Sequence, residues 1–247
     1  MVSLLFSIIA GLIGLLIGGT LLVQAAVAIA ARLGASPLLI GLVLVGFGTS
    51  TPELLTSLSA ALAGAPGIAT GNVVGSNIAN ILLILGLTAL LRPMVLARDV
   101  LLRDGIAMVL ASVVMVPMLL SGNVGRIEGA ILCALLAAYL LYSIRSGSSV
   151  ADDLPNVTQA ALIGRSIILF TAGLGLTRLG AHLLVSGASG YARLYGISEA
   201  VIGVTIVAVG TSLPELVTSL IAARKGQSDL ALGNIVGSNI FNILGIL

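Results

Sequence analysis

Residues 48–53 read GTSTPE, and the same pattern returns 162 residues later as GTSLPE at residues 210–215. A second pattern follows each copy at the same shift, GNVVGSNIANIL at residues 71–82 and GNIVGSNIFNIL at residues 233–244. Both pairs align without a gap. Two unrelated apolar helices would not share the positions of Pro, Glu and Asn in this way. The chain therefore carries an internal duplication, which decides how the rest of the sequence is interpreted.

The composition around these motifs is that of a membrane protein. Of the 247 residues, 58% are apolar and only 8% are charged, whereas soluble chains carry roughly 25% charged residues. The net charge of +2 and the 3% aromatic content, with no Trp, argue against nucleic acid as a partner. The single cysteine, Cys133, excludes an internal disulfide. We expect an all-α polytopic membrane protein.

Polar residues divide the chain into eight apolar stretches, each close to the roughly 20 residues that cross a bilayer. Helices are expected rather than strands, because the alternation typical of membrane strands is absent and lipid tolerates no open sheet edge. The polar residues 146–160 predict a cytoplasmic linker between the fifth and sixth helices. The expected spans are about residues 4–31, 37–63, 68–91, 100–120, 124–144, 161–190, 197–223 and 229–247.

Basic residues gather in the loops on one side of this arrangement. Cytoplasmic loops of membrane proteins are enriched in Lys and Arg, so we expect a multi-pass protein of the prokaryotic plasma or inner membrane with its N-terminus outside. The loops then placed inside contain Arg32, Arg92, Arg98, Arg103, Arg145, Arg165, Arg224 and Lys225. The loops placed outside contain Arg126 and Arg193.

The two motif copies must face opposite ways across the membrane, because five spans separate equivalent helices. The first repeat is placed at residues 1–145, with five helices and its motif at residues 46–86. The second is placed at residues 161–247, with three helices and its motif at residues 208–247. We expect an inverted repeat of five-helix sets with eight helices present of ten, so that the second repeat is incomplete. Inverted repeats with Gly- and Pro-interrupted helices are typical of secondary transporters.

Glu53 and Glu215 are the two acids that the sequence places inside apolar spans. A charge at that depth costs about 2.5–3.5 kcal/mol or more, which makes each glutamate a candidate for a functional site. Each follows a proline, Pro52 or Pro214, which removes one helical hydrogen bond and leaves a backbone carbonyl without its donor. Such a carbonyl needs a neighbouring group, water or a cation as its partner.

Hydroxyl and amide side chains are duplicated around the two glutamates. Each could simply join helices by hydrogen bonds, but a duplicated set around two carboxylates favours a binding site. All of these donors are oxygen atoms, which suit Ca²⁺ or Na⁺ and not Zn²⁺ or Cu⁺. The candidate metal ligands are Glu53, Glu215, Thr49, Thr211, Ser50, Ser212, Ser76, Ser238, Asn80 and Asn242.

The duplicated motifs resemble the α-repeats of the calcium/cation antiporter superfamily, especially its prokaryotic sodium/calcium exchanger-like members. The resemblance covers G-[TS]-S-x-P-E and G-N-x-x-G-S-N-I-x-N in both copies. It implies a fold of ten helices in two inverted sets. It also implies a secondary active antiporter that exchanges Ca²⁺ for Na⁺ by alternating access, in which helices one and six slide as a gate. It further implies that Glu53 and Glu215 form the central site. Thr49 and Thr211 would be calcium ligands. The implied sodium ligands are Ser50, Ser76, Ser212 and Ser238.

Other couplings and a channel remain open as alternatives. Some members of the superfamily carry an aspartate where Asn80 or Asn242 stands here, so a calcium/cation exchanger coupled to H⁺ or K⁺ is a second interpretation. A passive cation channel is a third, although inverted duplication favours a transporter. We expect Ca²⁺ and Na⁺, or H⁺ or K⁺, as transported partners within the lipid bilayer. No resident cofactor and no oligomer are predicted.

An intramembrane hydrolase is the remaining alternative. The string GASG at residues 187–190 matches a GxSG pattern, and His182 lies seven residues from Ser189. That spacing on a helix separates them by roughly 10 Å, too far for a hydrogen bond between serine and base, so no enzyme activity is expected. Arg178 and His182 have no basic counterpart in the first repeat. We expect both to face water or lipid headgroups.

Overall fold

The computed structural model describes residues 2–94, 98, 101–122, 124–146 and 163–247, and its regular elements within these ranges are helices. The predicted linker at residues 146–160 lies, from residue 147 onward, outside the described residues. Six helices are long and apolar enough to cross a membrane, and two bent helix pairs bring the number of possible spans to eight. The prediction of an all-α polytopic membrane protein is confirmed.

The spans follow the predicted order. The six continuous spans are α1 (Val2–Leu33), α5 with η2 and α6 (Pro66–Leu91), η3 with α8 (Leu101–Leu120), α9 (Arg126–Ser146), α10 (Ile163–Leu194) and α14 with η6 (Ser228–Ile246). The first bent pair joins α2 (Pro37–Ile40), η1 (Gly41–Val45) and α3 (Gly46–Thr49) to α4 (Thr51–Leu62) at 43°. The second joins η5 (Gly203–Val207) and α12 (Ala208–Thr211), which follow α11 (Glu199–Ile202), to α13 (Leu213–Arg224) at 54°.

Both bends fall at the serine of the duplicated motif. Ser50 and Ser212 have φ and ψ of −79° and 8°, and of −89° and 7°, which end the helix before them. The proline two residues later cannot donate a backbone hydrogen bond, so the helix restarts there instead of continuing. In the first copy, the Thr51 hydroxyl donates to the Gly48 carbonyl at 2.8 Å and satisfies it. The second copy has Leu213 at this position and lacks that hydroxyl.

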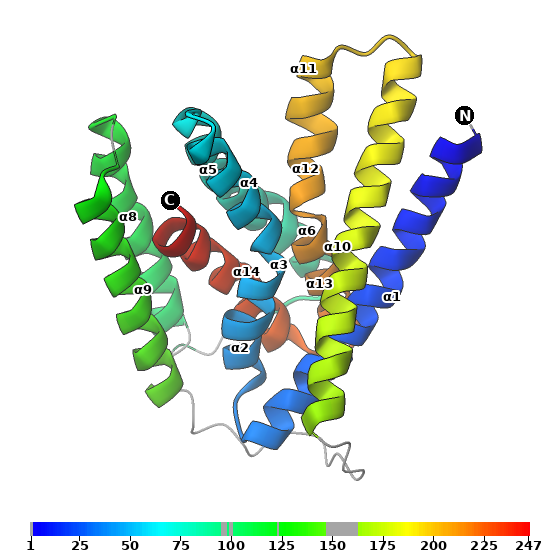
Figure 1. Cartoon of the computed structure of the whole chain (residues 1–247). Coiled ribbons are helices and arrows are strands. Elements are labelled where there is room, and N and C mark those ends of the chain that lie inside the picture. Colours follow the sequence, from blue (N-terminus) through cyan, green and yellow to red (C-terminus); the bar gives the residue numbers. More distant parts are fainter. Residues whose placement is uncertain (1, 95–97, 99–100, 123, 147–162) are drawn as a thin grey trace.

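Two 32-residue helices, α1 and α10, lie side by side along one flank of the molecule (Figure 1). Glycines bring their backbones into direct contact: a Cβ atom added to Gly18 would lie 2.5 Å from the Thr177 nitrogen. A Cβ atom added to Gly180 would likewise lie 2.5 Å from the Leu15 nitrogen. Such contacts between small residues are typical of tightly packed membrane helices.

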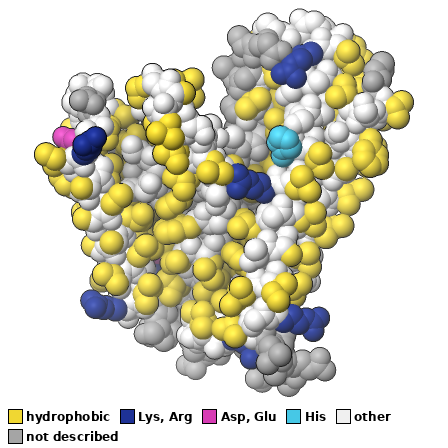
Figure 2. Space-filling view, viewed as in Figure 1, with side chains coloured by type: hydrophobic (Ala, Val, Ile, Leu, Met, Phe, Trp, Pro, Cys, Tyr) yellow, Lys and Arg dark blue, Asp and Glu magenta, His cyan; other side chains and the backbone are white. Residues whose placement is uncertain are grey.

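The helix α14 crosses the centre of the molecule, between α8 and α9 on one side and α1 and α10 on the other (Figure 1). Every residue from Leu230 to Ile240 on α14 is buried. Hydrophobic side chains cover most of the face shown in Figure 2, and most of its Lys and Arg side chains lie toward the ends of the molecule. This surface is the one expected for a chain that sits in lipid.

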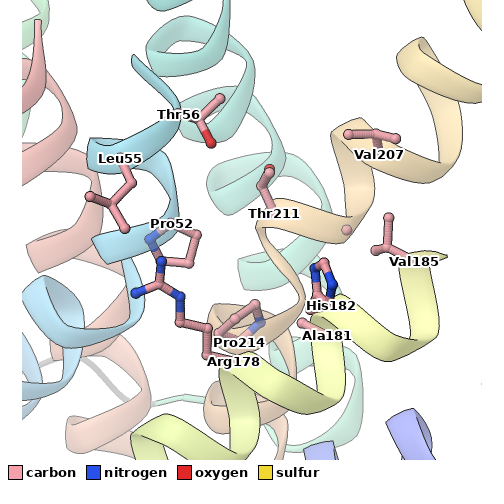
Figure 3. A pocket seen from close by; sticks show the side chains of 11 residues that line it. Pro52, Leu55, Thr56, Arg178, Ala181, His182, Val185, Val207, Thr211 and Pro214 are labelled. Carbon is pink, nitrogen blue, oxygen red and sulfur yellow. The ribbon is translucent and has the colours of Figure 1, made fainter. Parts of the chain in front are cut away.

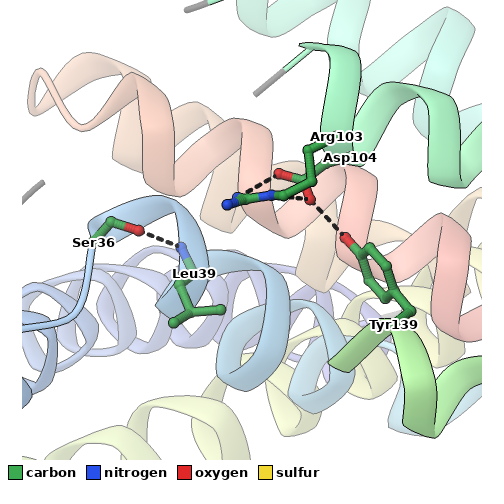
Figure 4. A network of polar contacts seen from close by, with 5 residues as sticks. All are labelled: Ser36, Leu39, Arg103, Asp104 and Tyr139. Carbon is green, nitrogen blue, oxygen red and sulfur yellow. Dashed lines mark hydrogen bonds and ion pairs between the residues drawn. The ribbon is translucent and has the colours of Figure 1, made fainter. Parts of the chain in front are cut away.

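A third buried acid lies near the start of a span and is neutralised within the protein (Figure 4). Asp104 is 2% exposed and accepts two hydrogen bonds from Arg103, at 2.9 and 2.8 Å. The Tyr139 hydroxyl of α9 donates to the same carboxylate at 3.1 Å. Because Asp104 has an internal cationic partner, it differs from the two motif glutamates and needs no external cation.

Candidate cation site

The predicted ligands converge where the two bent spans meet the crossing helices α5 (Pro66–Ile78) and α14. Nine of the ten are buried, and Thr211 is partly buried. Glu53 and Glu215 are each 1% exposed. The Ser50 hydroxyl donates to Glu215 Oε1 at 3.1 Å, which joins the break in the first copy to the glutamate of the second. This bond brings the two motif copies together in one region of the molecule.

The first asparagine of each GNxxGSN motif holds the backbone beside a glutamate. Asn72 Nδ2 donates to the Glu53 carbonyl at 3.1 Å and to the Ser57 hydroxyl at 2.9 Å. In the second copy, Asn234 Nδ2 makes the same two bonds, to the Glu215 carbonyl at 3.3 Å and the Ser219 hydroxyl at 2.9 Å. These asparagines position the glutamates. Neither asparagine was among the ten predicted ligands, although the duplication already contained both.

The remaining asparagines connect the two copies. Asn80 Nδ2 donates to Asn239 Oδ1 at 3.1 Å, and Asn242 Nδ2 donates to Asn77 Oδ1 at 3.0 Å. Asn77 Nδ2 also donates to the Asn239 carbonyl at 3.2 Å. The amide groups of Asn80 and Asn242 are thereby oriented by their nitrogen atoms. Their oxygen atoms are left available for another partner.

Several buried oxygens at the centre have no hydrogen-bond donor among the described residues. A buried acceptor without a donor costs free energy comparable to a lost hydrogen bond, and more if it is charged. Carboxylate, amide and hydroxyl oxygens are the ligands that Ca²⁺ and other hard cations prefer. This set of oxygen ligands therefore fits such a cation. The unpartnered atoms include Glu53 Oε2, Glu215 Oε2, Asn80 Oδ1, Asn242 Oδ1 and Ser212 Oγ.

The two threonines and the other two serines of the predicted set differ in their partners. Thr49 Oγ1 donates to Asn234 Oδ1 at 3.1 Å, and Ser238 Oγ donates to the Gly46 carbonyl at 3.2 Å. Both hydroxyls thus link the first bent span to α14. Ser76 is 5% exposed on α5, and Thr211 lies at the end of α12 beside the second break. The structure therefore links Thr49, Ser50, Glu215 and Ser238 across the two copies and places Thr211 at the second break.

A cavity of about 270 Å³ opens beside the two prolines, between α10 and the broken spans (Figure 3). Its lining includes Pro52, Pro214 and Thr211, together with Arg178 and His182 of α10. Both basic side chains are exposed, as expected, but they face a cavity next to the candidate site. Because neither residue has a basic counterpart in the first repeat, both were expected to face water or headgroups, and their position beside the candidate site was not predicted.

Asn72 and Asn234, which hold the backbone beside the two glutamates, give a first test of this geometry. Asn234→Ala should lower stability by about 1–3 kcal/mol and weaken cation binding, because it removes three buried hydrogen bonds, to the Glu215 carbonyl, the Ser219 hydroxyl and the Thr49 hydroxyl. Asn72→Ala should cost less, since Asn72 is only partly buried and water can replace its bonds. Thermal unfolding followed by circular dichroism measures both. Equal losses in the two variants would contradict this assignment.

The fold and the site together define a class of protein. Two motif copies, each on a bent helix pair, meet around buried carboxylate, amide and hydroxyl oxygens in an all-helical membrane protein, an arrangement typical of secondary transporters. A sequence profile of the family described as sodium/calcium exchanger protein matches residues 3–145 and 165–247. The chain belongs to this family.

Individual relatives agree with that assignment. The chain is 40% identical to the putative antiporter CaxA of Alkalimonas amylolytica, over 97% of this chain and 77% of that protein. It is 37% identical to the sodium/calcium exchanger MaX1 of Methanosarcina acetivorans, over 96% and 79% of the two chains. The solved structure of the sodium/calcium exchanger from Methanococcus jannaschii superposes with a TM-score of 0.87 at 35% identity, covering 99% of this chain and 80% of that one. These relatives are transporters, not enzymes, which argues against the hydrolase alternative.

Proposed function

We propose that this protein is a secondary active antiporter that exchanges Ca²⁺ for Na⁺ across a prokaryotic cell membrane by alternating access. The observation that carries the proposal is the set of unpartnered buried oxygens around Glu53 and Glu215. Two carboxylates supply a charge of −2, which one Ca²⁺ or two Na⁺ would balance. Competition of two kinds of ion for one such set would couple their movements.

The ten predicted ligands divide into an inner and an outer group in this proposal. Glu53 and Glu215, with Thr49 and Thr211, bind the divalent ion. The neighbouring hydroxyls and amides bind the monovalent ions: Ser50, Ser76, Ser212, Ser238, Asn80 and Asn242. The two repeats, residues 1–145 and 161–247, face opposite ways with the N-terminus outside, so that the site opens alternately to each side.

Support for alternating access comes from the helices that flank the site. The pair α1 and α10 is held together through glycine contacts, whereas the cavity of about 270 Å³ separates part of α10 from the broken spans. A displacement of this pair along the broken spans would change which end of the site is covered. This is the gating role that the sequence resemblance assigns to the first and sixth helices.

Transport into sealed vesicles tests the proposal. Purified protein in lipid vesicles loaded with Na⁺ should accumulate ⁴⁵Ca²⁺ when placed in Na⁺-free medium, and dissipation of the Na⁺ gradient with an ionophore should stop the uptake. Parallel vesicles loaded with K⁺, or carrying only a pH gradient, test the alternative couplings. Uptake driven equally well by either of these would contradict Na⁺ coupling. Calcium entry with no counter-ion requirement would indicate a channel.

A further inference from the structure

Arg178 lies on α10 and lines two cavities beside the broken spans. The larger cavity, about 270 Å³, extends to Pro52 and Pro214, and a second of about 190 Å³ also includes Thr49, one of the candidate ligands. Figure 3 shows the Arg178 side chain beside Pro52, with Pro214 close by. Each proline directly precedes one of the two site glutamates in the chain. The guanidinium group therefore lies in a cavity next to the candidate site.

Arg178 forms no ion pair with a carboxylate in the described part of the chain. The pair Arg103–Asp104 is the one salt bridge found there, so no described carboxylate lies within 4.0 Å of Arg178. The cavities that it lines lie beside Pro52 and Pro214, which directly precede Glu53 and Glu215, so its positive charge acts on the site through an electrostatic interaction. In a medium of low dielectric such an interaction persists beyond contact distance.

This charge occurs on only one of the two flanking helices. The repeat shift of 162 residues aligns Arg178 with Leu16 of α1, an apolar residue that is 58% exposed. His182 aligns with Thr20. A position that merely supported the packing of the paired helices would be expected to be apolar on both. The arginine is an asymmetric addition to an otherwise duplicated site.

We propose that Arg178 is a specificity-determining residue: it acts as a resident cation that replaces one monovalent ion in the charge balance of the site. The inference rests on the proposed function. Glu53 and Glu215 supply −2, and Asn80 and Asn242 are neutral amides, so Arg178 reduces the charge to be balanced to −1. One Na⁺ then neutralises the site, where two would be required without the arginine. A bound Ca²⁺ is also held less tightly, because it is repelled by the fixed charge.

Removal of the charge tests this directly. In Arg178→Gln, we expect Ca²⁺ to bind at least about tenfold more tightly, as measured by isothermal titration calorimetry on the purified chain in detergent. The Hill coefficient with which Na⁺ displaces Ca²⁺ should rise by about one, because a second Na⁺ replaces the lost charge. Arg178→Lys keeps the charge and should keep both values near those of the wild type.

Two further variants separate a charge effect from a structural one. Arg178→Leu removes the charge by introducing the residue that α1 carries at the equivalent position, and it should reproduce the Gln result. Because there are two neutral variants, the test remains decisive if one of them folds poorly. Arg165→Gln removes the same charge from the same helix 13 residues away, roughly 20 Å along its axis. It should leave both Ca²⁺ affinity and the Hill coefficient unchanged.

The outcomes distinguish this inference from the proposed function. If wild-type protein binds Ca²⁺ and Na⁺ displaces it, but Arg178→Gln and Arg178→Leu behave like Arg165→Gln, the resident-cation role is wrong and the exchanger assignment stands. If the wild type binds no Ca²⁺, or Na⁺ fails to displace it, both are wrong. If Arg178→Lys shows the same changes as the Gln variant, side-chain shape is responsible and the charge account is also overturned.

Discussion

Replacing either Glu53 or Glu215 with Gln should reduce Na⁺-dependent Ca²⁺ uptake by at least about a hundredfold. Each substitution keeps the shape of the side chain and removes half of the negative charge in a buried, low-dielectric site, where that charge interacts strongly with a cation. Both glutamates are 1% exposed and each has a carboxylate oxygen without a described hydrogen-bond donor. The measurement is initial ⁴⁵Ca²⁺ uptake into vesicles that contain equal amounts of each variant.

The expected loss is the same at both positions even though their surroundings differ. Glu215 accepts a hydrogen bond from the Ser50 hydroxyl, which could equally be donated to the amide oxygen of a glutamine. Glu128→Gln is the matched control, because Glu128 lies at the start of α9 and its carboxylate accepts a bond from the Gly125 nitrogen. Near-normal uptake in either site variant, or a comparable loss in Glu128→Gln, would show that the two glutamates do not form the transport site.

The duplicated motif was sufficient to predict the centre of the molecule. A proline removes one helical hydrogen bond, which agrees with the breaks at Ser50 and Ser212, although Pro117 lies inside the continuous helix α8. An acid at that depth must have a partner, so the burial of both glutamates in one site follows as well. The eight spans likewise follow from hydropathy, because length and polarity are strongly constrained in a bilayer.

The atoms that each polar residue uses could not be predicted. Asn72 and Asn80 are the same residue type in the same motif, yet Asn72 braces the Glu53 backbone and Asn80 bonds across the repeat to Asn239. The contact that each asparagine forms depends on the angle and position at which the helices cross. The spacing of residues in the sequence does not define either. The position of Arg178 was missed for a different reason. Symmetry between repeats identifies what the two halves share, and this residue belongs to one half alone.

Equivalent glycines also differ in their surroundings, although their motifs are almost identical. A Cβ atom added to Gly237 on α14 would clash with the Leu42 carbonyl oxygen, because the first bent span packs directly on the α14 backbone. The same addition to Gly75, its counterpart on α5, would meet no atom of the described residues within 4 Å. The small-residue pattern permits close packing in both copies, but of this pair of glycines only Gly237 makes a close contact.

This difference yields a prediction for two substitutions that the sequence alone would treat as the same. Gly237→Ala should destabilise the protein by about 1–3 kcal/mol or more, since a backbone carbonyl must move to admit the methyl group. Gly75→Ala should be neutral or stabilising by up to about 1 kcal/mol, because alanine stabilises an exposed helix more than glycine does. Thermal unfolding of both variants in detergent, followed by circular dichroism, measures the difference. Similar midpoints for the two variants would mean that α14 does not pack on the first bent span as described, and the alignment of Thr49 with Asn234 across that contact would be lost with it.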